Sequence, residues 1–317
     1  MDGPAAYLWA LCVSLLFRLS TSARTTFRTE VMPLLYYWRP DNYARDRRFG
    51  FGFHLNQNSP AMSTAEPGDS LWAFTQRRSD GSYVLAAELV VRALTQNPAN
   101  YRYGQWRIWG DLHRSRYFDV DVGPRVEPII RALGVRARAS RLGQSFQGHA
   151  AVRPISPEAH LMLSEFTRDV PILQTAAIYP EDEFEARLVH EEPVRNLMVQ
   201  ETGVTRDARV RYLFESIDVR RARKNIQSLH ELYGGRCQIC LYDPQGLYGH
   251  RICHGHHIQW LSRGGDDELE NMVLVCPNHH SAIHKDDAPF DYGDFSFRFT
   301  NGLCERLAVN HHLPSAN

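Results

Sequence analysis

The pattern of hydrophobic and polar positions changes along the chain. Between residues 34 and 179, short apolar runs alternate with turn sequences, which is the pattern of β-strands. One run, WAFT at 72–75, follows a Pro-Gly-Asp turn at 67–69, and a second run at 83–91 follows an Asp-Gly pair. Because Asp-Gly favours tight turns between antiparallel strands, we expect a hairpin there. A further short strand is expected at 117–120.

Two helices are expected in the same region. Residues 126–133 (VEPIIRAL) have helical spacing, and a second helix starts at Pro157 after Ser156, because proline fits the first helical position. Short strands joined by turns, together with two short helices, predict an α+β fold with a small β-barrel between residues 32 and 180.

A polar, helical segment is expected from 181 to 232. Apolar side chains recur at helical spacing toward its end, and Gly234 and Gly235 stop the last helix. Basic side chains gather before that stop, at Arg220, Arg221, Arg223 and Lys224. They are candidates for contacts with the phosphate backbone of a nucleic acid, and a solvent-exposed helix face is the alternative.

Composition narrows the class of protein. The chain has 317 residues, 43% of them hydrophobic, which is ordinary for a globular protein but too long for one small core. Basic and acidic residues balance at 36 each, so a nucleic acid would have to meet a segregated positive face. Six cysteines are too few for a disulfide scaffold, which favours reduced thiols and a cytoplasmic location.

Residues 1–31 differ in character from the rest of the chain. An apolar run at 7–17 (YLWALCVSLLF) has the length of a signal peptide and is too short to span a membrane. Asp2 precedes it without any Lys or Arg, which is unusual for export, and the composition changes at Met32. We interpret 1–31 as an upstream extension before a natural start at Met32. A signal sequence or an apolar N-terminal helix is the alternative.

Most of the cysteine and histidine residues that could bind metal lie between residues 233 and 290. Cys237 and Cys240 form a Cys-x-x-Cys pair, and Cys276 and His279 form a second pair with the same spacing. Two such pairs supply the four ligands of a tetrahedral zinc ion, and four protein ligands leave no open position, so a structural role is expected. Cys253 lies outside this spacing; we interpret it as a buried thiol, with a ligand role as the alternative.

Further histidines are interleaved with this set. The chain reads His-His-Ile, then a Gly-Gly turn, then an asparagine and two histidines four residues apart, at His256, His257, Asn271, His280 and His284. Histidines four apart share one helix face and can meet one ion. The ordered pattern resembles the HNH endonucleases, also called ββα-metal or treble-clef nucleases.

This resemblance implies a role for each residue. His256, His280 and His284 would bind a catalytic divalent metal ion, and His257 would be the general base that deprotonates water. Asn271 would hold the loop that keeps His257 in register. The implied reaction is hydrolysis of DNA phosphodiester bonds, leaving 5′-phosphate and 3′-hydroxyl ends. An all-imidazole site favours ions such as Ni, Mn or Zn, with Mg as the alternative in the cell.

The N-terminal region resembles the PUA superfamily, in particular its EVE-type branch. The resemblance is carried by residues 67–74, by the strand at 83–91 and by residues 101–109. It implies a DNA-reading domain that accepts a flipped, modified base between aromatic side chains. Trp38, Trp72 and Trp106 would line the base pocket; the alternative is that these rings form the barrel core.

Together these observations predict a modular endonuclease. Its parts are an extension (1–31), a PUA-like reader (32–180), a basic helical linker (181–232), an HNH domain with structural zinc (233–290) and a tail (291–317). The expected role is restriction of DNA that carries modified bases. The alternatives are an HNH nuclease in repair or sequence reading and a non-catalytic, zinc-dependent nucleic-acid-binding protein. No membrane partner is expected, and one active centre facing two DNA strands leaves a homodimer open.

Overall fold

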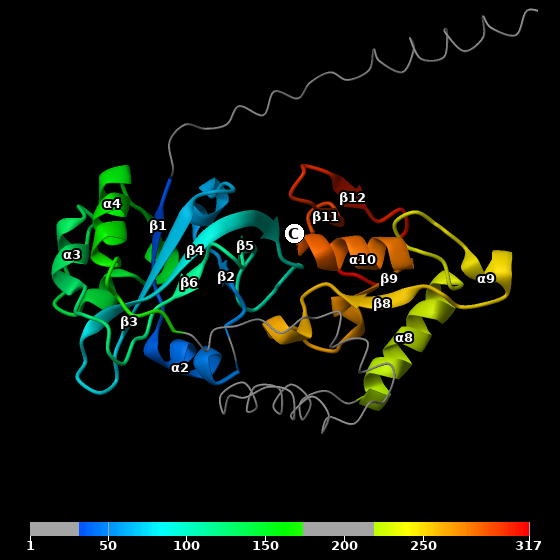
Figure 1. Cartoon of the computed structure of the whole chain (residues 1–317), viewed down its shortest axis with the longest axis horizontal. Helices are drawn as coiled ribbons and strands as arrows, with labels where there is room; N and C mark the ends of the chain where they lie inside the picture. Colours follow the sequence, from blue (N-terminus) through cyan, green and yellow to red (C-terminus); the bar gives the residue numbers. More distant parts are fainter. Residues whose placement is uncertain (1–31, 50, 174–218, 317) are drawn as a thin grey trace, which may run out of the picture. The chain divides into compact units, whose positions relative to one another are not determined.

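The N-terminal part of the protein is built on a curled, seven-stranded sheet (Figure 1). The computed structural model describes residues 32–49, 51–173 and 219–316. The strands are β1 (Leu34–Tyr37), β2 (His54–Gln57), β3 (Ser70–Gln76), β4 (Tyr83–Gln96), β5 (Trp106–Gly110), β6 (Arg116–Tyr117) and β7 (Val152–Pro154). They follow the order β2-β5-β4-β3-β1-β7, with β6 paired to β4. The β1–β3 pair is parallel and the others are antiparallel.

The β3–β4 hairpin lies where the sequence predicted it. Gly81 has a φ of +72° in its turn, a conformation that costs glycine little, and Arg77 pairs with Asp80 at 2.9 Å across the turn. Strand β4 continues well past the expected end at residue 91 and is 14 residues long. Register shifts after Ala73 and Val91 bend the ladder, which explains the curl.

Successive side chains of the central strands enter two different cores. Leu34 and Leu71 belong to one buried cluster, whereas Leu35 and Trp72 belong to the other. This is the alternation expected of a strand with both faces covered. The second cluster packs against α3 (Glu127–Ala132) and α4 (Pro157–Phe166), close to the predicted helices. Helix α2 (Pro40–Phe49) contributes Tyr43 to the first cluster.

The PUA-like barrel is not confirmed. The sheet ends at β2 and β7, and in the described part of the chain these two edges do not pair. The expected strand at 117–120 is also shorter than predicted, because only Arg116 and Tyr117 join the ladder and Phe118 forms an isolated bridge with Ile172. The structure therefore has a mixed α+β arrangement with a curled sheet.

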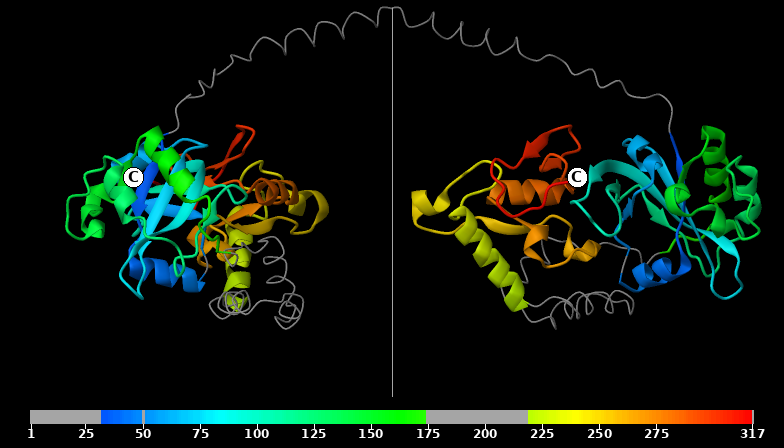
Figure 2. Two further views of the ribbon diagram at one scale, coloured as in Figure 1. Left: turned by 60° about the vertical axis from the view of Figure 1, so that its left-hand side comes forward. Right: turned by 180° about the vertical axis from the view of Figure 1, so that it is seen from behind.

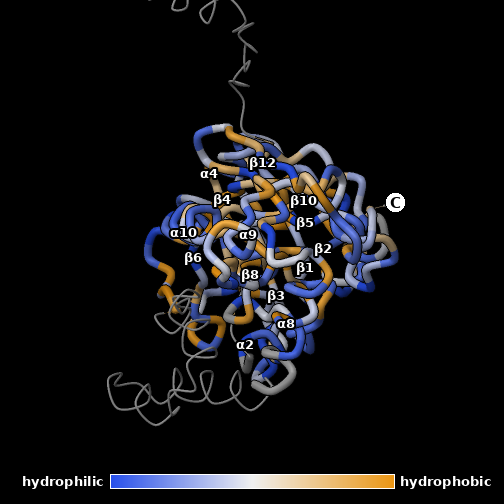
Figure 3. Tube along the Cα trace, turned by 90° about the vertical axis from the view of Figure 1, so that its right-hand side faces the viewer, coloured by the Kyte–Doolittle hydropathy of each residue, from blue (hydrophilic) through white to orange (hydrophobic). Residues whose placement is uncertain are grey.

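The C-terminal module has a two-stranded hairpin at its centre. Strands β8 (His254–His257) and β9 (Met272–Val275) pair antiparallel, and α8 (Val219–Tyr233) and α10 (Pro277–Asp286) flank them (Figures 1 and 2). A short helix α9 (Pro244–Tyr248) follows the first cysteine pair. The hydropathy colours show α10 as mostly hydrophilic (Figure 3). Helix α10 carries Ile283 as its buried apolar side chain.

The segment 291–317 was expected as a tail, and its described residues, 291–316, belong to this module. Strands β10 (Phe290–Asp291), β11 (Ser296–Arg298) and β12 (Cys304–Arg306) form a three-stranded sheet. Phe290, Phe297 and Leu313 are buried in the same cluster as β9. The apolar spacing in this stretch is too short to predict strands by itself, and its burial depends on β9 and α10.

Two of the predicted segments fall wholly or mostly outside the described residues. They are the extension at 1–31 and the linker at 181–232, of which residues 219–232 are described. Residues 174–180, at the end of the predicted reader, also lie outside, so the predictions made there stay predictions. Within the described ranges, no helix combines the length and the apolar character that crossing a bilayer requires.

Candidate metal and catalytic centre

The residues of the candidate site lie on the β8–β9 hairpin and on helix α10. The register pairs His256 with Val273 and His257 with Met272, so the two adjacent histidines point to opposite faces of the hairpin. All four residues of β9 are buried, which fixes the strand against the core. Cys276 is the N-cap of α10 and Pro277 opens the helix, as proline does at the first turn.

Three histidines converge beside this hairpin. His256 Nδ1 lies 3.1 Å from His284 Nε2, which lies 3.2 Å from His280 Nε2. Two nitrogen ligands at about 2.0–2.1 Å from one zinc ion lie about 3.3 Å apart in tetrahedral geometry. The three donor atoms therefore fit a single divalent ion. His256 is fully buried while the two helix histidines are half-buried, so the ion site would face outward on the helix side.

His257 points away from these three residues and meets a carboxylate. Its Nε2 atom lies 3.1 Å from Asp267 Oδ1, and both side chains are less than a tenth exposed. An ionised carboxylate accepts from N–H, so this contact favours the tautomer that carries its proton on Nε2 and leaves the Nδ1 lone pair as an acceptor. The Asp267 backbone oxygen in turn accepts from Asn225 Nδ2 of α8 at 2.7 Å.

Asn271 makes three side-chain hydrogen bonds within the loop between the two strands. Its Oδ1 accepts from the Gln259 backbone N–H at 2.8 Å, and its Nδ2 donates to the carbonyl oxygens of Gln259 at 2.9 Å and Asp266 at 2.7 Å. These bonds close the loop two residues after His257 and one residue before Asp267. An apolar residue at position 271 would leave those backbone groups without their partners.

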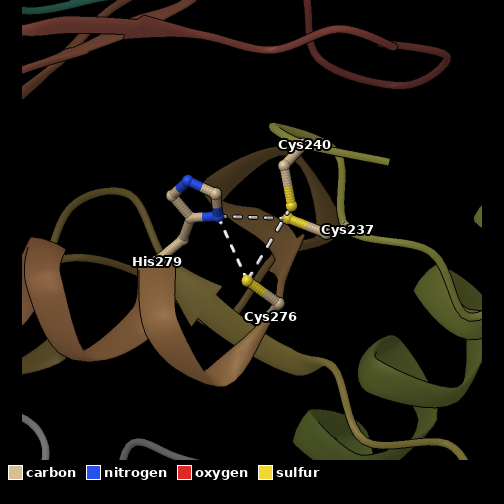
Figure 4. Close-up of side chains that lie close together, drawn as sticks. All are labelled: Cys237, Cys240, Cys276 and His279. Carbon is tan, nitrogen blue, oxygen red and sulfur yellow. Dashed lines mark hydrogen bonds between the residues drawn. The ribbon is translucent and has the colours of Figure 1, made fainter. Parts of the chain in front are cut away.

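The second Cys/His group gathers at the start of α10 (Figure 4). His279 Nδ1 is 3.1 Å from Cys276 Sγ and 3.6 Å from Cys237 Sγ, and the Sγ atoms of Cys240 and Cys276 are 4.0 Å apart. Thiolates bound to one zinc ion at about 2.3 Å lie about 3.8 Å apart. The four donors thus fit one tetrahedral ion with no open position.

The thiols of this region differ in their surroundings. Burial raises the pKa of the Cys237 thiol to about 12, and a coordinated zinc ion would reverse that preference because it deprotonates its thiol ligands. Cys253 is 5% exposed, and burial raises its pKa to about 12 as well. It lies outside both groups of donors found among the described residues, as expected of a buried thiol.

An arginine links the loop to the end of α10. Arg263, 2% exposed in its side chain, pairs with both oxygens of Asp287 at 2.8 and 3.1 Å. Asp287 caps the helix with a φ of +51°, and burial raises the pKa of its carboxyl despite the nearby arginines. Desolvation is the larger influence on the pKa of Asp287. The contact of Arg263 with both carboxylate oxygens still holds the loop to the helix that carries His280 and His284.

The tryptophans predicted to form a base pocket occupy different environments. Trp72 is fully buried, stacks on Phe118 and donates from Nε1 to His160, so it is a core residue with no surface for a base. Trp38 is half-buried and packs edge-on against Tyr43 and Phe51. Trp106 is half-buried at the start of β5.

The basic residues predicted at the end of the linker lie in α8. Arg220, Arg221 and Arg223 fall in its first turns, where only the backbone is described, and Lys224 is exposed. The helix places them on the same element as Asn225, which contacts the loop of His257.

The comparisons with known proteins concern the region just described. A model of the HNH endonuclease family matches residues 237–286, which contain both groups of metal donors. This part of the chain is therefore similar to the HNH endonuclease family. A protein named Anaredoxin, from Nostoc sp. (strain PCC 7120 / SAG 25.82 / UTEX 2576), is 30% identical over 76 residues, which are 24% of this chain and 88% of that protein. At the level of the family, this match suggests a nuclease domain that uses a divalent metal ion on DNA.

Several residues of the site were not predicted from the sequence. The sequence gives a weak indication of Asp267, because acidic residues follow the Gly-Gly turn a few positions before Asn271. It gives no indication of Arg263 or Asp287, since their pairing spans 24 positions and depends on where α10 ends. Glu305, near His279, comes from the segment expected to be a tail.

Proposed function

We propose that this protein is a metal-dependent DNA endonuclease in which His257 is the general base. The observation that carries the proposal is the arrangement of four histidines: three donors close enough for one ion, and a fourth, adjacent to His256 in the strand, buried against Asp267 on the other face of the hairpin. A protein that only binds nucleic acid has no use for a buried imidazole held by a carboxylate next to a metal site.

In the proposed reaction, His257 takes a proton from the attacking water on Nδ1. Asp267 holds Nε2–H and stabilises the imidazolium that results. The water oxygen forms a bond to phosphorus, and the bond from phosphorus to the 3′ oxygen breaks. The 3′ oxygen takes a proton from a solvent water molecule, giving 5′-phosphate and 3′-hydroxyl ends. An ion bound by His256, His280 and His284 would supply charge stabilisation at the leaving oxygen. Imidazole donors suit Ni, Mn or Zn, and Mg is the alternative.

The direct test is incubation of the full chain with plasmid DNA of different methylation states. Cleavage is expected with added Mg, Mn, Ni or Zn and none after treatment with a chelator. Failure to cleave any plasmid with any of these ions, while DNA is still bound, would favour the non-catalytic binding protein instead.

Asn271→Ala is expected to lower the cleavage rate while leaving metal binding in place. The substitution removes three hydrogen bonds that hold the loop after His257, and none of them involves a metal donor. Misplacing a catalytic base by about 1 Å costs on the order of 10²-fold in rate. Single-turnover rates and metal titrations on the same protein give the answer, and an unchanged rate would contradict the positioning role.

We further propose that the N-terminal sheet reads the DNA and selects modified bases, so that the enzyme acts in restriction. Trp106 is the better placed of the predicted tryptophans, because it is half-buried and comes after a loop with two further aromatic rings, Tyr101 and Tyr103, whose centroids are 5.6 Å apart. Aromatic side chains combined with a positively charged segment suit a base that leaves the stack. The basic start of α8 would meet the phosphates.

Trp106→Ala is expected to reduce the preference for a modified base tenfold or more. Stacking of a base on an aromatic ring contributes about 1–3 kcal/mol, and that contribution is lost with the ring. The measurement is binding of oligonucleotides that differ only in cytosine modification, using a His257→Ala background so that the DNA stays intact. Trp72→Ala is the comparison: it should unfold the sheet, since removing a buried Trp costs about 3–5 kcal/mol. Equal affinity of the parent protein for all oligonucleotides would remove the reader proposal and leave the nuclease proposal standing.

A further inference from the structure

His279 has a carboxylate partner on the side facing away from the cysteines. Its Nδ1 atom faces the sulfur atoms of Cys276 and Cys237, whereas its Nε2 atom lies 3.3 Å from Oε2 of Glu305. One ring nitrogen therefore points to the ion site and the other to a carboxylate. His279 and Glu305 are 16% and 26% exposed in their side chains, so the contact is partly shielded from water.

The strand register explains why Glu305 points inward. In the β11–β12 ladder, Glu305 is paired with Phe297, and paired residues place their side chains on the same face of a sheet. Phe297 is fully buried in the core of the nuclease module. The neighbours of Glu305 along β12, Cys304 and Arg306, are both exposed and lie on the opposite face.

We propose that Glu305 is a positioning residue for the structural zinc site. This inference rests on the proposed zinc ion, and it concerns a residue outside the stretch that matches the HNH family model. A carboxylate that accepts from Nε2–H fixes the tautomer in which the Nδ1 lone pair faces the metal, and it makes the imidazole a stronger donor. The ring is also held in orientation, so less freedom is lost when the ion binds.

The same C-terminal segment also holds the cysteine pair. The backbone N–H of Ala308 donates to the carbonyl oxygen of Gln238 at 2.7 Å, and Gln238 Nε2 donates to the carbonyl oxygen of Val309 at 3.2 Å. Gln238 lies between Cys237 and Cys240 and is fully buried. Residues 304–309 thus contact both halves of the donor set, one through a side chain and the other through the backbone.

The test is zinc affinity of the full-length protein, measured by competition with a chromophoric chelator. Glu305→Ala is expected to weaken zinc binding about 10- to 100-fold, the range found when such a partner is removed. Glu305→Gln should fall between Glu305→Ala and the wild type, because its amide oxygen still accepts the hydrogen bond without the charge. Arg306→Ala is the matched control: it changes the next residue of the same strand, which faces solvent, and should bind zinc like the wild type.

The outcomes separate three possibilities. Zinc affinity of both Glu305 variants within twofold of Arg306→Ala would overturn the positioning role. A wild-type protein that holds no zinc would overturn the zinc site itself, which is a different result. If Glu305→Ala merely weakened the fold, zinc-saturated protein would melt lower than the wild type and Glu305→Gln would bind zinc normally. That pattern would also contradict the proposal.

Discussion

Replacing His257 with alanine is expected to abolish DNA cleavage without disturbing the fold or the binding of DNA. The side chain is buried against Asp267 and lies outside the three-histidine donor set, so its loss removes the base and leaves the ion donors in place. General-base catalysis typically contributes about 10²–10⁴-fold in rate. Single-turnover cleavage of a labelled duplex, together with its binding affinity and the circular dichroism spectrum, tests all three parts of this expectation.

The control for that experiment is His250→Ala, which changes an exposed histidine of the same module. Asp267→Asn is the informative companion, because it keeps the size of the side chain and removes the negative charge that faces His257 Nε2. We expect an intermediate loss of rate. Cleavage near the wild-type rate by His257→Ala would contradict the assignment of the base, whatever the companion variant does.

Sequence reasoning was most successful where the spacing of chemical groups is local. His280 and His284 are one helical turn apart, so their meeting follows from helix geometry once α10 exists, and the two pairs around Cys237 and Cys276 have a spacing that suits one ion. The hairpin between β3 and β4 was equally local, because an Asp-Gly turn and alternating apolar residues determine it. These features need few contacts from distant parts of the chain.

Long-range features could not be derived in this way. The burial of Trp72 depends on which of two faces of the sheet receives α3 and α4, and nothing at position 72 distinguishes a core ring from a pocket wall. The length of β4 depends on β5 and β6, which pair with it from later in the chain. Whether the edges of a sheet close into a barrel likewise depends on curvature summed over several strands.

The C-terminal segment shows the same limit at the site. Phe297, Glu305 and Leu313 are buried or half-buried only because β9 and α10 provide a surface for them. Read alone, the stretch after residue 290 has short apolar runs separated by Asp and Gly, which is also the pattern of an irregular tail. The contacts of this segment with the zinc region could therefore not be predicted from the sequence.

Cys276→Ser is expected to release zinc and unfold the nuclease module. Cys276 Sγ is 3.1 Å from His279 Nδ1, and the residue is both a predicted ligand and the N-cap of α10, the helix that carries His280 and His284. A structural zinc ion contributes its binding free energy directly to folding, so removing one thiolate should cost several kcal/mol. Zinc content by elemental analysis and the melting transition of the full-length protein are the two measurements.

Cys253→Ser provides the matched control, since it makes the same atomic change at another buried cysteine of the same core. Placing a hydroxyl in that core costs about 1–3 kcal/mol, which lowers the melting temperature but leaves the zinc content near one ion per chain. Two variants with equal destabilisation and equal zinc content would mean that Cys276 acts only through packing. Loss of zinc in Cys276→Ser alone would place the ion between β9 and the cysteine pair at 237–240. Because Cys276 is the N-cap of α10, the helix that carries His280 and His284 would then depend on the structural zinc ion. Neither histidine belongs to the donor set of that ion.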